Sequence, residues 1–260
     1  MQKVLNLLTA LLILSSISSY SQTKFNMNIY GGYSMPVSDL EGTFPDTLGS
    51  SGKLDFTTAR TLLTKKGYNF GAAFKFAVDT TGNARLTGGL NYSSFSGSKD
   101  YAIPFQETRT YKSKVTIFTI SAGAEYSLSP DKKINPFFGM DLAANFFGGK
   151  IEAKGDTSFV IDRSQETRIG IIATAGINIS LSEKIGVVVG VKYSLTNIIG
   201  KSTETTTTTG TNTDIGETGN SALFELPLND AETSSNKSKS FSYFQFYTGL
   251  SVNFGRFLNK

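Results

Sequence analysis

The sequence predicts an all-β protein: an eight-stranded antiparallel up-and-down transmembrane β-barrel. Three observations lead to this prediction. Apolar residues recur at every second position in eight segments, each of about ten residues. Short turns rich in Gly, Pro, Asn and Asp alternate with long polar connections. Charged residues make up only 18% of the 260 residues, against about 25% in ordinary soluble domains.

The beginning of the chain is predicted to be a cleaved signal peptide, residues 1–21, followed by the barrel domain, residues 22–260. Lys3 precedes an apolar run over residues 4–14, and small or polar residues follow it. This order of charged, apolar and small-residue regions is typical of a secretory signal, with cleavage expected before Gln22. The apolar run is too short to span about 30 Å of hydrocarbon, which argues against a membrane-anchoring helix.

The segment from Tyr68 to Val78 shows the alternation most clearly. Its even positions are aromatic or aliphatic, and its odd positions are Asn, Gly, Ala and Lys. Because successive side chains of a strand point to opposite faces, one face of this strand is apolar and the other is small or polar. The same division appears in seven further segments, around residues 25–33, 85–92, 118–126, 138–146, 168–179, 186–195 and 243–254.

The connections between these segments alternate in length. Three are short turns, at residues 79–83, 129–133 and 182–184. Four are long loops, expected at about 34–67, 96–113, 148–167 and 197–240. An eight-stranded barrel with both termini on one side needs this arrangement, and membrane barrels place short turns on one side and long loops on the other. A strand of about ten residues also matches the 9–11 residues of a tilted membrane-crossing strand.

A soluble barrel is the alternative explanation of the same alternation of apolar and polar residues. A secreted, lipocalin-like barrel that binds an apolar ligand would enclose its apolar face, including Phe70, Phe74 and Phe76. Its polar face would then meet water and carry many charges. Here that face consists mainly of Gly, Ala, Ser and Asn, which suit a narrow interior. Aromatic residues near the ends of the apolar face are also typical of interfacial girdles, so we expect the apolar face to contact lipid.

Six charged residues on the polar faces are candidates for a network in the lumen: Lys75, Arg85, Glu125, Asp141, Arg168 and Lys192. The lumen of an eight-stranded barrel is just wide enough to be filled by side chains. Buried charges need partners, so we expect Glu125 and Asp141 each to bridge basic residues. A plug of salt bridges is the structural interpretation that the strand count favours. A gated path for ions or solutes is the functional alternative.

The composition excludes most common chemistries. The chain contains no Cys and no His, which removes disulfides, thiolate or imidazole metal sites and Ser-His-Asp triads. We therefore expect no enzymatic activity, no cofactor and no metal. The formal net charge is +4, but the basic residues form no stripe interleaved with aromatic residues, so we expect no nucleic-acid binding.

The last predicted strand carries the most specific pattern. Tyr247, Gly249, Val252 and Phe254 place an aromatic residue, a Gly and alternating hydrophobic residues before a final aromatic residue. This pattern resembles the C-terminal signal that the barrel-assembly machinery reads, although six residues, 255–260, follow Phe254. With its strand pattern and topology, the chain resembles small bacterial outer-membrane barrels of the OmpA/OmpX type, particularly those of the Bacteroidetes.

The resemblance implies a location in the bacterial outer membrane, contact with outer-membrane lipid and insertion by the barrel-assembly machinery. The expected function is that of a non-enzymatic barrel with a filled lumen, whose loops serve surface interaction or envelope integrity. A narrow channel for small or hydrophobic solutes is the second expectation. The sequence does not name an extracellular partner for the loops. Enzymes on similar small barrels use a His, which this chain lacks.

Overall fold

The computed structural model describes residues 25–44, 62–102, 108–155, 159–199 and 240–254. The predicted signal peptide, the greater part of the predicted loop 197–240 and the residues after Phe254 lie outside these described residues. Among the described residues, no helix is long and apolar enough to cross a membrane.

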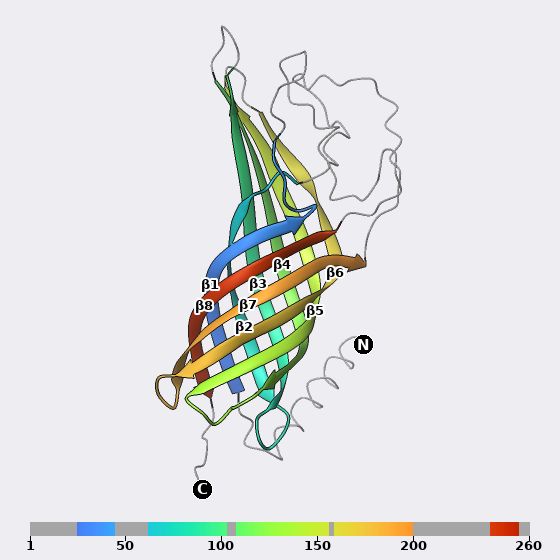
Figure 1. The fold of residues 1–260 in the computed structure, drawn as a ribbon. Helices are drawn as coiled ribbons and strands as arrows, with labels where there is room; N and C mark the ends of the chain where they lie inside the picture. Colours follow the sequence, from blue (N-terminus) through green and yellow to red (C-terminus); the bar gives the residue numbers. More distant parts are fainter. Residues whose placement is uncertain (1–24, 45–61, 103–107, 156–158, 200–239, 255–260) are drawn as a thin grey trace, which may run out of the picture.

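Eight antiparallel strands close into a barrel in sequence order (Figure 1), as the alternation predicts. The strands are β1 (Phe25–Ser38), β2 (Lys66–Ala77), β3 (Ala84–Tyr101), β4 (Arg109–Ser127), β5 (Ile134–Lys154), β6 (Phe159–Ser180), β7 (Ile185–Ile199) and β8 (Phe241–Phe254). Closure comes from β1 and β8, which pair from Phe25↔Phe254 to Ser38↔Phe241. Phe25 and Phe254 therefore lie at the end that carries the short turns, the short-turn end; the opposite end is the long-loop end.

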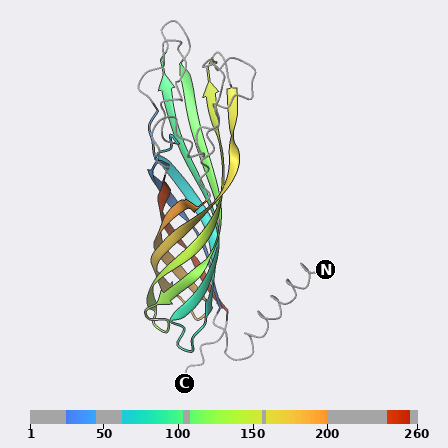
Figure 2. The ribbon, with the colours of Figure 1, turned by 90° about the vertical axis from the view of Figure 1, so that its right-hand side faces the viewer.

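The strands β3 to β6 are longer than the sequence predicts. They contain 18, 19, 21 and 22 residues, and their upper parts stand beyond the rest of the barrel (Figure 2). Parts of the expected loops 96–113 and 148–167 are therefore strand. The register explains the extension: β3 and β4 stay paired as far as Tyr101↔Arg109, so the backbone groups above the membrane-crossing length still find partners in a neighbouring strand.

The turn after β2 shows how the short connections are fixed. Gly82 has a φ of 77°, a left-handed conformation that favours glycine. The Asp79 carboxylate accepts hydrogen bonds from the Thr81 hydroxyl and from the backbone N–H groups of Asn83 and Ala84. Desolvation acts to raise the pKa of Asp79, but these hydrogen bonds outweigh it and hold the pKa below its ordinary value.

The apolar face lies outside the barrel, which overturns the lipocalin-like alternative. Phe70 is 57% exposed and Phe76 44%, and Phe74 stacks on Phe25 on the same outer face. Large exposed hydrophobic side chains occur on all eight strands. Large apolar side chains exposed on every strand suit lipid, not water, because soluble proteins rarely expose contiguous apolar patches larger than a few hundred Å².

Candidate functional site: the barrel lumen

The lumen begins, at the short-turn end, with a charged cluster contributed by three adjacent strands. The Lys75 ammonium on β2 lies 2.6 Å from the Glu125 carboxylate on β4. The Arg85 guanidinium on β3 lies 3.6 Å from the other carboxylate oxygen. Arg85 and Glu125 are register partners, which places their side chains next to each other on the inner face. One carboxylate thus faces two cations in a nearly dry environment.

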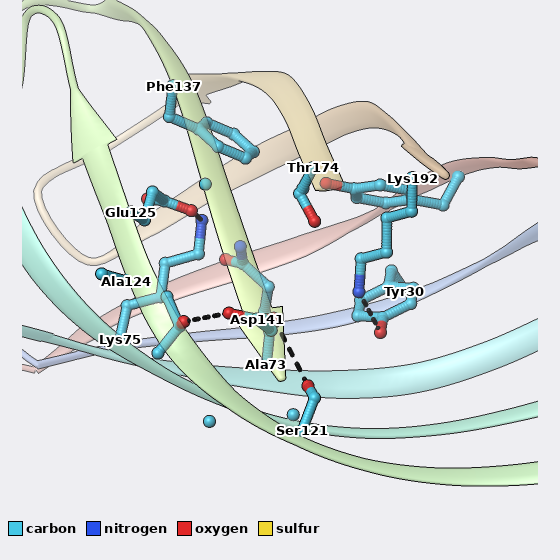
Figure 3. A pocket seen from close by; sticks show the side chains of 16 residues that line it. Tyr30, Ala73, Lys75, Ser121, Ala124, Glu125, Phe137, Asp141, Thr174 and Lys192 are labelled. Atoms are coloured by element: carbon cyan, nitrogen blue, oxygen red, sulfur yellow. Dashed lines mark hydrogen bonds and ion pairs between the residues drawn. The ribbon is translucent and has the colours of Figure 1, made fainter. Parts of the chain in front are cut away.

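Aromatic and backbone groups hold the two cations of this cluster. The Lys75 nitrogen lies 3.8 Å from the centre of the Phe137 ring, a cation–π contact from β5 (Figure 3). Arg85 donates a hydrogen bond of 3.0 Å to the Gly82 carbonyl in the turn below. Contacts with the Glu125 carboxylate, the Phe137 ring and the Gly82 carbonyl therefore hold the two cations. Removing the single carboxylate would leave both buried cations without a counter-charge.

Above this cluster, two further charged side chains line one small cavity. Asp141 on β5 accepts hydrogen bonds from Thr87 at 2.5 Å and Ser121 at 3.4 Å. Lys192 on β7 donates a hydrogen bond of 2.6 Å to the Tyr30 hydroxyl on β1, two strands away around the barrel (Figure 3). The cavity has a volume of about 30 Å³, room for one or two water molecules.

Asp141 differs from the expectation that it would bridge basic partners. Among the described residues it forms no ion pair, and its carboxylate is held by hydroxyl groups instead. The reason is the direction of Lys192, whose ammonium points to Tyr30 and lies 4.2 Å from the centre of that ring. The Tyr247 ring lies 4.9 Å from the Tyr30 ring, tilted by 48°, and contributes a second aromatic face to the same lysine.

The middle of the lumen is filled by amide and hydroxyl side chains. Gln245 donates hydrogen bonds to Asn91 at 3.3 Å and to Ser93 at 3.1 Å, which links β8 to β3 across the interior. Thr119 donates to Asn145 at 2.9 Å, and Asn145 donates to the Thr196 carbonyl at 3.0 Å. Each of these groups is buried, so the hydrogen bonds replace contacts with water that the side chains lose.

An apolar cap closes the long-loop end of the lumen. We use this name for the buried cluster of Leu40, Leu62, Phe95, Val115, Ile117, Phe147, Phe241 and Tyr243. Leu40 and Leu62 belong to the first long connection, which folds inward. Ser113 donates a hydrogen bond to the Leu62 carbonyl, and Thr64 donates one to the Leu40 carbonyl. Side chains from the barrel wall complete the cap, with the Phe95 and Tyr243 rings 5.1 Å apart.

Arg168 lies apart from the other predicted lumen charges. It is fully buried on β6, and its guanidinium carbon lies 5.2 Å from the Phe241 ring centre and 5.9 Å from that of Phe147. The structure thus gathers Lys75, Arg85 and Glu125, places Asp141 and Lys192 in the cavity that Lys75 and Glu125 also line, and sets Arg168 against two rings of the apolar cap.

The apolar cap is the part of the lumen that sequence reasoning missed. Phe95, Val115, Ile117 and Phe147 have the same parity along their strands as the predicted inward charges Arg85, Glu125 and Asp141. Continuing the alternation beyond the expected strand ends would have found them. Leu40 and Leu62 carry no such signal, because they lie in a connection outside the strands.

The four residues of the predicted assembly signal divide between the two faces of β8. Tyr247 is buried in the lumen beside Tyr30. Gly249 also faces inward, where an added Cβ would collide with the Ile29 carbonyl oxygen. Phe254 is exposed on the outer face and contacts the Phe25 ring at 5.3 Å, and Val252 alternates with it on that face.

The chemistry that the lumen offers is that of a packed interior. Among the described residues, no group of three or more His, Cys, Asp or Glu side chains is placed to hold a metal ion. The carboxylate of Glu125 is engaged by two cations, and that of Asp141 by two hydroxyl groups. The arrangement therefore joins the barrel walls and fills the space between them.

Three solved outer-membrane barrels are similar to this chain. Neisserial surface protein A (NspA) has 14% identity and a TM-score of 0.46, with 88% of this chain and 97% of that chain covered. OprG of Pseudomonas aeruginosa has 8% identity, a TM-score of 0.44 and coverages of 91% and 99%. Ail, the attachment invasion locus protein of Yersinia pestis, has 9% identity, a TM-score of 0.40 and coverages of 88% and 99%. A search of curated proteins gives no significant match.

A family assignment comes from the sequence profile of the Opacity family of porin proteins, which matches residues 66–216, more than half of the chain. The matched region runs from the start of β2 to beyond the end of β7. Together with the closed eight-stranded barrel and its apolar outer face, this places the chain in the bacterial outer membrane. The protein belongs to the Opacity family of porin proteins.

Proposed function

We propose that this member of the family is a closed, non-enzymatic barrel, a rigid scaffold that carries surface loops and conducts few or no ions through its lumen. The observation that carries the proposal is the filling of the interior at successive heights. The Glu125 cluster, the Tyr30–Lys192 pair, the Gln245 network and the apolar cap block the lumen in turn. The small cavity is lined by residues of the first two of these levels, including Glu125 and Lys192, and by none of the residues of the apolar cap.

A measurement of single-channel conductance tests this proposal directly. Purified full-length protein in planar bilayers should give little or no current, whereas a stable open channel would overturn the closed scaffold. A Phe95→Ala/Phe147→Ala/Phe241→Ala variant removes three rings of the apolar cap and serves as the matched control. It should also conduct little, because the Glu125 cluster, the Tyr30–Lys192 pair and the Gln245 network still fill the lumen, and a large current would show that the cap alone closes it.

A narrow channel is the second candidate, and one observation favours it. The cavity of about 30 Å³ is lined by charged and hydroxyl groups, which suit water or a small ion. If the channel exists, Glu125→Gln and Asp141→Asn should change its conductance or its ion selectivity. A current that neither substitution alters would show that the ions take another path.

We also propose how the protein reaches the membrane and what its loops do. Residues 1–21 would direct export, and the barrel-assembly machinery would read the last strand through Val252 and Phe254, which lie on the outer face. The extended strands β3 to β6 support a role for the long-loop end in contacting an extracellular partner or neighbouring envelope components. On this reading the chain functions like the small barrels of the OmpA/OmpX type.

A further inference from the structure

The small cavity of the lumen is bordered by all eight strands, because each of them contributes at least one lining residue (Figure 3). Its volume is about 30 Å³. A water molecule needs about 10–15 Å³ of such a cavity. The site therefore suits one or two water molecules, or an ion of similar size.

The charges that line this cavity favour a neutral ligand. Among the described residues, two cations, Lys75 and Lys192, and two anions, Glu125 and Asp141, border it. A bound cation would meet both ammonium groups, and a bound anion would meet both carboxylates, in a buried site where repulsion is little screened. Lys75 and Arg85 both lie against Glu125, so the lining charges left without an ion pair are Asp141 and Lys192. Water escapes this repulsion, because it carries no net charge and both donates and accepts hydrogen bonds.

One wall of the cavity carries a buried hydrogen-bond acceptor that lacks a partner. Asn28 on β1 is 2% exposed, and its side-chain oxygen Oδ1 accepts no hydrogen bond among the described residues. Buried side-chain oxygens in native proteins almost always have a partner, which is either a protein group or an ordered water. Because Asn28 lines the cavity, a water bound there can supply the donor.

The hydrogen-bonding capacity of Asp141 and Lys192 is only partly used. A carboxylate offers about four lone-pair sites, and that of Asp141 accepts one hydrogen bond from Thr87 at 2.5 Å and a longer one from Ser121 at 3.4 Å. An ammonium group carries three N–H donors. Among the described residues, that of Lys192 donates one hydrogen bond, to Tyr30 at 2.6 Å. Two opposite charges thus border one polar cavity, and both have hydrogen-bonding groups to spare.

We infer that the cavity binds one or two ordered water molecules that link Asp141 to Lys192 as a water-mediated ion pair and donate a hydrogen bond to Asn28. A bridging water accepts from the ammonium group and donates to the carboxylate, which is nearly as favourable as a direct contact. Thr174, the register partner of Lys192, offers a further hydroxyl group to the same water. The bridge joins β1, β5 and β7 inside the lumen. The inference concerns this cavity alone, so it stands whether or not the rest of the lumen conducts.

A crystal structure of the full-length protein grown with rubidium bromide tests the occupant of the cavity. Rubidium and bromide scatter anomalously, which distinguishes a bound cation or anion from water. We expect electron density without an anomalous signal, within hydrogen-bond distance of Asp141, Lys192 and Asn28. An anomalous peak in the cavity, a cavity without density, or a direct ion pair between Asp141 and Lys192 would overturn the inference.

A double-mutant cycle in the full chain tests the bridge independently. The test pair is Asp141→Asn and Lys192→Met, measured by urea unfolding in lipid vesicles. Each substitution removes one end of the bridge, so the second should shift the folded-to-unfolded equilibrium about five-fold less when the first is present. The matched control pair is Asp141→Asn and Lys75→Met, because Lys75 lines the same cavity but is bound to Glu125. The effects of the control pair should add.

The heat-dependent mobility shift on SDS gels shows whether each variant folds. If Lys192→Met does not fold, Thr174→Val takes its place in the test pair, because it removes a hydroxyl group from the cavity and keeps nearly the same side-chain volume. Additive effects in the test pair, or equal coupling in the test and control pairs, would show that no water-mediated bridge joins the two charges.

Discussion

Two carboxylates in the same lumen have different partners, and this difference sets their expected contributions. Glu125 lies between Lys75 and Arg85, whereas Asp141 accepts hydrogen bonds from Thr87 and Ser121. Removing one partner of a buried ion pair leaves a desolvated charge without compensation, which costs far more than the pair itself contributes. Glu125 is therefore the residue on which the charged end of the lumen depends.

Glu125→Gln should destabilise the barrel by about 3–5 kcal/mol, because it leaves the ammonium of Lys75 and the guanidinium of Arg85 buried together without a counter-charge. Urea unfolding in lipid vesicles, followed by the mobility of the folded band on unboiled SDS gels, measures the free energy of unfolding.

Asp141→Asn is the matched control for Glu125→Gln. The amide oxygen can still accept hydrogen bonds from Thr87 and Ser121, so the loss should stay near 1 kcal/mol. Equal losses for the two variants would contradict the assignment of Glu125 as the single anion of the cluster.

Small residues in the lumen leave room for its aromatic side chains. A Cβ on Gly190 would lie 2.5 Å from the Tyr247 hydroxyl oxygen, and one on Gly71 would lie 2.8 Å from that of Tyr30. Both distances are shorter than van der Waals contact. The glycines on the inner face are therefore part of the packing around Lys192, whose two aromatic neighbours occupy the space that side chains at these positions would fill.

At the scale of elements, the first long connection is part of the core. Leu40 and Leu62 are almost completely buried, and the Leu62 carbonyl accepts a hydrogen bond from Ser113 on β4. The Asp39 N–H also donates a hydrogen bond to the Ser240 carbonyl, and the Asp39 carboxylate accepts one from the Ser240 N–H, just before β8. Connections usually lie over a surface, but this one joins opposite parts of the barrel wall and closes the long-loop end.

Leu62→Ala should destabilise the protein by about 2–5 kcal/mol, because the apolar cap loses side-chain volume that the surrounding strands cannot fill. Leu142→Ala is the comparison, since Leu142 is 66% exposed on the outer face and lipid can occupy the space that the smaller side chain leaves. Urea unfolding of both variants in the same lipid gives the difference. If the Leu142 variant lost as much stability as the Leu62 variant, the cap would not be a stabilising core.

At the scale of the whole molecule, the pairing of β1 with β8 closes the barrel and stabilises it. The seam between β1 and β8 is continuous over the full length of both strands, so within the membrane-crossing part no strand presents an unpaired edge. In hydrocarbon an unpaired backbone group costs several kcal/mol, which makes opening of the seam unfavourable. A closed barrel of this kind resists SDS until it is heated.

Gly32→Ala should weaken this closure, whereas Gly31→Ala should not. A Cβ on Gly32 would collide with the backbone carbonyl oxygen of Phe246 across the seam, and neither backbone can move without breaking the β1–β8 pairing. A Cβ on Gly31 points to the outer face, and its nearest atom is the Asn69 oxygen at 3.4 Å. SDS gels run after incubation at increasing temperature measure closure. The Gly32 variant should lose the fast-migrating folded band at a lower temperature, and equal temperatures for both variants would refute the role of the seam.

How much of the lumen could be predicted depends on whether a residue lies in an alternating strand. Lys75, Arg85 and Glu125 lie in clear strands, so their inward direction follows from parity alone. Which of them meet does not follow, because it depends on the register between strands. Asp141 shows the limit: its parity points it inward, but the direction of the Lys192 side chain toward Tyr30 decides that the partners of Asp141 are hydroxyl groups.

The sequence by itself determined the fold class and the two faces of the wall, because a strand has a fixed period of two and a membrane selects which face is apolar. Only the tertiary structure decided how far β3 to β6 extend, how the apolar cap closes the lumen, and which of the inward charges meet. These features depend on register, shear and inward folding of a connection. Such contacts join residues far apart in the chain, and no local pattern records them.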